Sequence, residues 1–224
     1  MICEDDVDWD VRIKYLLRNF AISAQAIVAS SEREVYFHDL PNPSIKIPGI
    51  SPYGDDFDLL WLGHCGADMP VKKVIQLNDE SVPEPQYLHS WLMGEFTPLA
   101  VFPNHTRIVG QNTNMLVCSL VYAVSQKGAR KILYDLGLQK LTGPFDLMLQ
   151  TWCSNPENIC ISALPQLFDH HRAKGSMSLD SDIRVSEGIR DAAVTNNVRL
   201  SVAMNMQKLL DGDTDYYDQY PDTV

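Results

Sequence analysis

Basic residues and long apolar runs are both scarce in this sequence. Its 224 residues include 18 Lys and Arg against 29 Asp and Glu, so the net charge is −11. Because nucleic-acid phosphates attract basic surfaces, this balance predicts that nucleic acid is not a partner. No apolar run is long enough to cross a bilayer, so we expect no membrane span. The acidic start, MICEDDVDWD, is not typical of a secretory signal or a transit peptide.

Cysteine is sparse too, and none of the five cysteines has the C-x-x-C spacing of zinc or redox sites. Two pairs could form disulfides, Cys65 with Cys118 and Cys153 with Cys160. The alternative is five buried thiols in a reducing compartment, and the sequence leaves both open. A glycosylation sequon at residues 104–106 matters only in a secreted chain.

The pattern of apolar residues predicts strands that alternate with helices, and therefore an α/β fold. With 45% hydrophobic residues, the chain can bury the core of one large domain. We expect this domain to cover residues 1–210. The acidic segment 211–224 is expected to be a flexible tail.

The individual elements follow from spacing, caps and breakers. Helices are expected at residues 8–29 with Asp8 and Asp10 in the first turn, at 126–136 behind an N-cap at Ser125, from Pro144 to 152, and at 199–210. Strands are expected at 57–63, as a pair at 107–109 and 116–124, and at 159–164. Residues 38–56 and 64–105 are rich in proline and are expected to be irregular.

The acidic run at the chain start has a possible chemical meaning. Glu4 and Asp6 follow a short apolar start, and alternation along an extended strand would point both side chains the same way. Two such carboxylates can hold Mg²⁺ or Mn²⁺, and the ion could bridge to a diphosphate leaving group.

This acidic run has three other interpretations, and the residues that follow exclude the first of them. An EF-hand loop beginning at Asp6 is excluded, because Val11 and Leu17 stand where it needs glycine and glutamate. A phosphohydrolase would use Asp6 as nucleophile and Asp8 as acid. The acids could also simply cap a helix on a solvated face.

Five motifs, taken in order, resemble glycosyltransferase family 25, which includes lipooligosaccharide and collagen galactosyltransferases. They are ICEDDV at 2–7, DLLWLG at 58–63, YAVSQKGARKIL at 122–133, GPFDLML at 143–149, and a closing motif from Gln166 through His171 to Asp182. The variants WLGHCG, PFDLML and PQLFDHH look most like the fungal branch. The resemblance covers about residues 2–210.

The resemblance implies a GT-A fold that transfers a hexose, with galactose expected, from a UDP-sugar to a hydroxyl of a glycan or glycoprotein. Transfer would invert the anomeric carbon and use Mn²⁺ (or Mg²⁺). The implied metal ligands are Glu4 and Asp6, with Asp8 as a weaker candidate. A histidine would complete the set, His171 in preference to His170.

The other implied roles concern the acceptor and the donor. Asp146, at a helix N-terminus that favours its ionised form, is the candidate base for the acceptor hydroxyl. Asp5, Trp61 and His64 are the candidates for contact with the donor. Asp58 is expected to be a structural hydrogen-bonding acid.

The sequence departs from the family at its start, because family members carry a long segment before the acidic motif that holds the donor's base and ribose. We therefore expect a partial GT-A domain that lacks much of the donor pocket and exposes an apolar sheet edge, and the sequence leaves open whether this domain is active alone. The alternatives are a non-catalytic remnant that binds a partner or glycan, and the phosphohydrolase. The family's usual setting, the sequon and the possible disulfides favour the Golgi lumen; otherwise the chain is cytoplasmic.

Overall fold

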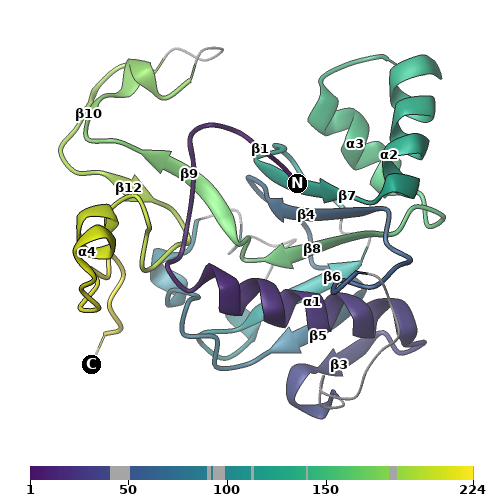
Figure 1. Ribbon diagram of the computed structural model, residues 1–224, viewed down its shortest axis with the longest axis horizontal. Helices are drawn as coiled ribbons and strands as arrows, with labels where there is room; N and C mark the ends of the chain where they lie inside the picture. Colours follow the sequence, from purple (N-terminus) through teal and green to yellow (C-terminus); the bar gives the residue numbers. More distant parts are fainter. Residues whose placement is uncertain are drawn as a thin grey trace.

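The computed structural model describes residues 1–40, 51–89, 92, 99–111, 114–139, 141–181 and 186–223. It has the expected α/β character, with helices packed on a large mixed sheet (Figure 1). The described helices are α1 (Ile13–Ala29), α2 (Gln126–Ile132), α3 (Phe145–Cys153), α4 (Met206–Asp211), the π-helical η5 (Leu133–Gln139), and the 3₁₀ turns η1 (Phe37–Asp39), η2 (Pro85–Tyr87), η4 (Leu99–Val101) and η6 (Met177–Leu179). The strands are β1 (Ile2–Cys3), β2 (Val7–Trp9), β3 (Glu34–Tyr36), β4 (Leu59–Gly63), β5 (Lys72–Gln76), β6 (Arg107–Gln111), β7 (Val121–Val124), β8 (Cys160–Leu164), β9 (Phe168–Arg172), β10 (Gly175–Ser176), β11 (Ile189–Arg190) and β12 (Val194–Thr195).

In the described part of the chain, ten strands form one sheet whose main path runs β1-β7-β4-β8-β6-β5-β3. The central strand β4 is parallel to β8 and antiparallel to β7. A branch leaves this path at β9, which pairs antiparallel with β2 and β12. Because Val7 lies opposite His170, the branch brings the chain start beside residues 168–172.

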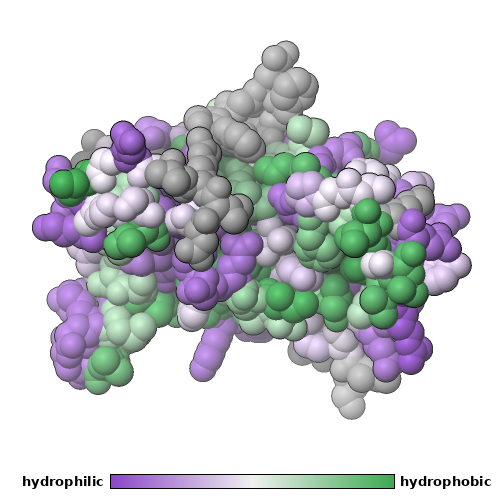
Figure 2. Space-filling view, turned by 90° about the horizontal axis from the view of Figure 1, so that it is seen from above, coloured by the Kyte–Doolittle hydropathy of each residue, from purple (hydrophilic) through white to green (hydrophobic). Residues whose placement is uncertain are grey.

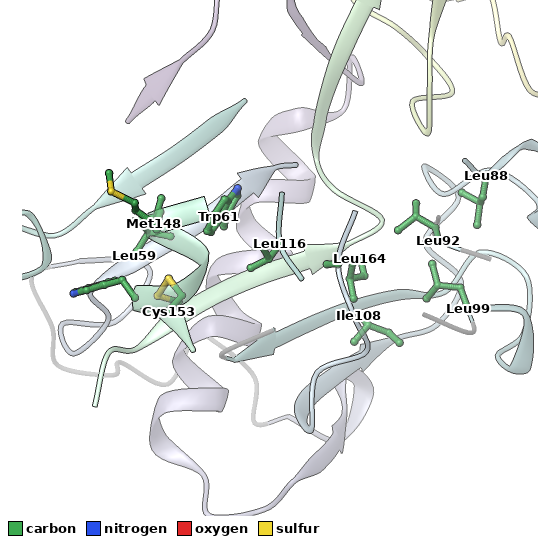
Figure 3. Close-up of a cluster of buried hydrophobic side chains, with 14 of the residues drawn as sticks. Leu59, Trp61, Leu88, Leu92, Leu99, Ile108, Leu116, Met148, Cys153 and Leu164 are labelled. Carbon is green, nitrogen blue, oxygen red and sulfur yellow. A yellow bond between two sulfur atoms is a disulfide. The ribbon is translucent and has the colours of Figure 1, made fainter. Parts of the chain in front are cut away.

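Strand alternation lets the apolar run of β4 serve two cores. Leu59 and Trp61 face one core together with Met148 of α3 (Figure 3). Leu60 and Leu62 face the other, where Phe20 of α1 is fully buried. The sheet is therefore covered by α1 on one face and by α3 on the other, and all five residues of β4 are buried.

The first helix begins later than the sequence predicts. Residues 7–9 form β2, and α1 starts only at Ile13. Asp10 lies before the helix, where its carboxylate accepts hydrogen bonds from the Arg12 N–H at 2.9 Å and from the Arg12 guanidinium. Asp8 is a buried residue of β2, so its expected place in the first helical turn is wrong. The period-two pattern of Val7–Trp9 was concealed by the helical spacing of the residues that follow.

Several other predicted elements are confirmed by the structure. The strands β4 and β8 and the helix α3 lie where their apolar runs and Pro144 indicate. Ser125 caps α2 by accepting a hydrogen bond from the Gly128 N–H at 3.0 Å. Gly128 itself is required there, since a Cβ would lie 2.0 Å from the Asp58 carbonyl oxygen.

Other predictions need correction. The strands at 107–111 and 121–124 both form but do not pair with each other, because β6 lies between β5 and β8 and β7 lies between β4 and β1. Residues 64–105 contain β5, whose two lysines hide its strand pattern. The helix expected at 199–210 is confined to α4. Of the loop expected at 38–56, residues 41–50 lie outside the described residues.

Both candidate disulfides are present, which rules out the alternative of five thiols. Cys65 is bonded to Cys118 and Cys153 to Cys160, while Cys3 is an exposed thiol. In the described residues no helix combines the length and apolar character needed to cross a bilayer, in agreement with the sequence.

The acidic C-terminal segment docks onto the domain instead of standing free of it. Asp218 forms a salt bridge with Arg199 at 2.6 Å. The Gln219 amide donates to the Thr195 carbonyl at 2.8 Å, and Tyr220 stacks on Tyr87. Residues 211–224 are the segment that composition predicts to be a flexible tail, and in this structure Arg199 gives part of it a largely buried counter-charge that composition does not reveal.

Candidate active site

A cleft of about 750 Å³ contains most of the acidic motif. It is lined by residues 4–6, by the loop 118–120 before β7, by the first turn of α3, and by residues of β9 and of 179–181. These segments are far apart in the sequence and meet because β1 pairs with β7 while β2 pairs with β9. The cleft thus lies where the branch at β9 separates from the main path of the sheet.

The short strand pairings fix the acidic residues in place. The Glu4 N–H donates to the Leu120 carbonyl at 2.9 Å, which continues the pairing of β1. The chain then turns at residues 5–6, and the His171 N–H donates to the Asp6 carbonyl at 2.7 Å. The turn therefore presents the side chains of Glu4 and Asp6 next to β9.

Glu4, Asp6 and His170 form a group that could hold a metal ion. Their nearest ligand atoms all lie within 4.8 Å of one another. His170 Nε2 lies 3.4 Å from Glu4 Oε2 and 3.8 Å from Asp6 Oδ2. Two carboxylates and one imidazole suit Mn²⁺, and Mg²⁺ less well because of the nitrogen. The donor set therefore fits the divalent cation that the sequence predicts, and we call it the cation group.

His171 lies outside the cation group, so the geometry favours His170 over the histidine that the sequence analysis preferred. Neighbouring residues on a strand point to opposite faces, and His170 takes the face of the cleft. The ring of His171 lies within hydrogen-bond distance of Thr195 Oγ1, with Nδ1 at 3.0 Å. It also lies 3.7 Å from Asp8 Oδ2, away from Glu4 and Asp6.

Asp8 is fully engaged in a buried hydrogen-bond network. Its side chain is 2% exposed. Its Oδ2 accepts hydrogen bonds from the hydroxyls of Thr195 and Ser201, and its Oδ1 accepts from the Ala203 N–H at 3.0 Å. This carboxylate ties β2 to the C-terminal segment. It does not line the cleft, and it is not placed to act as the acid of a phosphohydrolase.

Asp146, the candidate base, lines the same cleft as the cation group. It is half-buried in the first turn of α3. Its Oδ2 accepts a hydrogen bond from the Cys118 N–H at 3.2 Å. Cys118 is held in a left-handed conformation with φ of 62°, by its disulfide to Cys65 and by the Trp61 indole N–H, which donates to its carbonyl.

The three residues expected to contact the donor have different positions. Asp5 is exposed and lines the cleft. Trp61 and His64 are both 0% exposed, so the expectation that they touch a ligand is wrong. Burial lowers the pKa of His64 to about 4, and its Nε2 bonds the Ala163 carbonyl at 2.9 Å. Asp58 is the structural acid that we expect, since it is fully buried and its Oδ2 bonds Lys131.

The sequence assigns no role to Arg172, which lines the cleft. Arg172 donates through Nη1 to Asp6 Oδ2 at 2.7 Å and to the Asp180 carbonyl at 2.9 Å. Strand alternation places Arg172 on the same face as His170, and this spacing is the signal that could have revealed it. Of the closing motif, Asp182 lies outside the described residues.

An apolar groove of about 290 Å³ lies beside the cleft and shares Phe145 with it. It is lined by Ile2, by Tyr122 of β7 and by residues of α2 and η5. Leu133, Leu138 and Leu141 are all more than half exposed in this region. Figure 2 shows hydrophobic side chains gathered on the side of the molecule where α2 and α3 lie.

Comparisons with protein-family models, with curated proteins and with solved structures return no match for this chain.

Proposed function

We propose that this chain is a metal-dependent inverting glycosyltransferase of the family 25 type with a GT-A-like domain. It transfers a hexose, with galactose expected, from a UDP-sugar to a hydroxyl of a glycan or glycoprotein. The observation that supports this most strongly is that one cleft of about 750 Å³ holds both the cation group and Asp146. A transferase of this kind needs a place for the diphosphate and a base for the acceptor on the same reacting centre.

Glu4, Asp6 and His170 would hold Mn²⁺ or Mg²⁺. A cation bound there supplies positive charge to the diphosphate as it leaves. Asp5 is exposed in the same cleft, and in this proposal it would contact the sugar or ribose hydroxyls of the donor.

Asp146 acts on the acceptor. Its Oδ2 is engaged by the Cys118 N–H, so Oδ1 receives the proton of the acceptor hydroxyl as that oxygen attacks the anomeric carbon. The new bond forms between the acceptor oxygen and the anomeric carbon, and the bond from that carbon to the phosphate oxygen breaks. Attack from the side opposite the leaving group inverts the anomeric configuration.

The two disulfides support a secretory setting, such as the Golgi lumen, because such bonds persist in oxidising compartments. Asn104 of the sequon is exposed, which fits the same setting.

The proposal is tested by turnover. Purified protein is incubated with Mn²⁺, UDP-galactose or UDP-glucose, and a mixture of hydroxyl acceptors, and UDP release is followed. We expect release from the wild type and its loss in Asp6→Asn. Asp213→Asn, which removes an exposed carboxylate far from the cation group in sequence, is the matched control and should keep the wild-type rate. A folded wild type that releases no UDP under any of these conditions would instead be a non-catalytic binding protein.

A further inference from the structure

Arg172 holds one of the carboxylates of the cation group. Its Nη1 lies 2.7 Å from Asp6 Oδ2. Both carboxylate oxygens of the nearby Asp180 are bonded by Arg190, at 2.6 and 3.1 Å, and Arg172 acts on this carboxylate only at longer range. Asp180 offers Arg172 only its backbone carbonyl, at 2.9 Å. The ion pair of Arg172 is therefore with Asp6.

The same oxygen of Asp6 faces the histidine of the cation group. Asp6 Oδ2 lies 3.8 Å from His170 Nε2. A divalent cation held by the cation group would lie close to the Arg172 guanidinium, because Asp6 contacts both. Two positive charges at such a separation repel strongly in a partly buried cleft. The metal ion and Arg172 thus compete for one carboxylate.

We propose that Arg172 is an exchangeable internal cation: it pairs with Asp6 when no metal ion is bound, and on metal binding it moves off to bind the diphosphate of the donor. This inference rests on the proposed function and adds to it a donor-binding residue and a binding order, with the metal ion before the nucleotide. The planar guanidinium suits phosphate oxygens, since it can donate two parallel hydrogen bonds to them.

The setting of Arg172 limits the motion to its side chain. Arg172 is paired with Val194 of β12, and on the other side of β9 its neighbour His171 donates its N–H to the Asp6 carbonyl. The backbone is therefore fixed from both sides, while the side chain is 21% exposed and lines the cleft. A change of rotamer is enough to move the guanidinium from Asp6 toward a ligand in the cleft.

Calorimetric titration of the full chain tests this with two probes, Mn²⁺ alone and UDP at saturating Mn²⁺. In Arg172→Gln we expect Mn²⁺ to bind about fivefold or more tightly than in the wild type, because a competing charge is removed. We expect UDP to bind roughly tenfold more weakly, because a charged hydrogen-bond donor to the diphosphate is lost. Arg18→Gln, at an exposed arginine of α1 that does not line the cleft, is the matched control, and should leave both affinities at the wild-type value.

The two results can fail separately. Weaker Mn²⁺ binding in Arg172→Gln would overturn the inference, since Arg172 would then orient Asp6 for the metal instead of competing with it. Unchanged UDP binding would overturn the second half. Both variants are first checked for a wild-type circular dichroism spectrum, and Arg172→Met, which also removes the charge, replaces Arg172→Gln if the latter fails to fold. No Mn²⁺ binding by the wild type itself would contradict the proposed function, and the inference with it.

Discussion

The Cys118 N–H donates a hydrogen bond to Asp146 Oδ2 at 3.2 Å, and so links the candidate base to a disulfide. Cys118 is bonded to Cys65, which lies two residues after the buried end of β4. The Trp61 indole fixes the carbonyl of the same residue at 3.0 Å. The orientation of Asp146 is therefore set by contacts that reach from the sheet core to the cleft.

Removing this disulfide should reduce turnover more than its effect on stability alone explains. In Cys65→Ala/Cys118→Ala the loop at 118 gains freedom, and a misplaced base lowers kcat by roughly tenfold or more. The chain-entropy contribution of a bridge with a sequence separation of 53 is about 4 kcal/mol, so the variant is assayed well below its melting temperature.

The second disulfide supplies the control for this experiment. Cys153 and Cys160 close a bridge with a sequence separation of 7 at the end of α3, away from the first turn that carries Asp146. Cys153→Ala/Cys160→Ala should lose about 2 kcal/mol of stability with kcat unchanged. An equal fall of kcat in both double variants would contradict a special link between Cys118 and Asp146.

Asp146→Asn should remove the base while leaving the donor site intact. We expect kcat to fall roughly hundredfold or more, as for other lost general bases. Calorimetry should show UDP binding in the presence of Mn²⁺ at the wild-type affinity. A variant that keeps most of its kcat would show that another group takes the proton.

His170 and His171 should differ sharply in metal binding although they are neighbours. His170→Ala should weaken Mn²⁺ binding by roughly tenfold or more. Loss of a residue that only hydrogen-bonds to a metal ligand already lowers metal affinity by about that factor. His171→Ala should leave Mn²⁺ affinity unchanged and cost about 1 kcal/mol of stability through its lost contact with Thr195. Titration with Mn²⁺ measures the first effect and urea unfolding the second. A larger loss of Mn²⁺ affinity in His171→Ala than in His170→Ala would refute the assignment of His170 to the cation group.

His64 should make the protein less stable as the pH falls below neutrality. Its pKa is lowered to about 4 by burial, against 6.5 in the unfolded chain, so the unfolded state binds the extra proton between these values. The free energy of unfolding therefore decreases from pH 6.5 down to 4, by about 3 kcal/mol in total, and this contribution changes no further below pH 4.

A glutamine at this position isolates the effect. His64→Gln can keep a donor toward the Ala163 carbonyl but does not titrate, so its urea unfolding should fall less steeply between pH 6.5 and 4. His38→Gln, at an exposed histidine, should keep the wild-type pH dependence. If His64→Gln and the wild type change in parallel, the buried histidine is not the cause.

Local patterns predicted the regular elements but not how they meet. The run of β4, the Ser125 cap and the start of α3 after Pro144 depend on neighbours in the sequence, and all three are confirmed. The contact between Glu4 and His170 joins residues 166 positions apart and depends on the pairing of β2 with β9. No spacing rule in the sequence could specify that pairing.

The burial of individual side chains was also hidden from the sequence. Trp61 lies in β4 and His64 directly after it. Neither side chain reaches the cleft, because the strands and cores around β4 bury both completely. The choice between His170 and His171 depends in the same way on which face of β9 borders the cleft. Composition likewise gave no sign of the salt bridge between Arg199 and Asp218 in the acidic C-terminal segment.

The central claim is that one cleft binds the metal ion and the donor next to Asp146. The most direct measurement is anomalous diffraction from crystals grown with Mn²⁺ and UDP. The account predicts a manganese peak among Glu4, Asp6 and His170, with the diphosphate beside it in the cleft. A manganese peak at other residues, or UDP bound in a different pocket with the cation group empty, would contradict it.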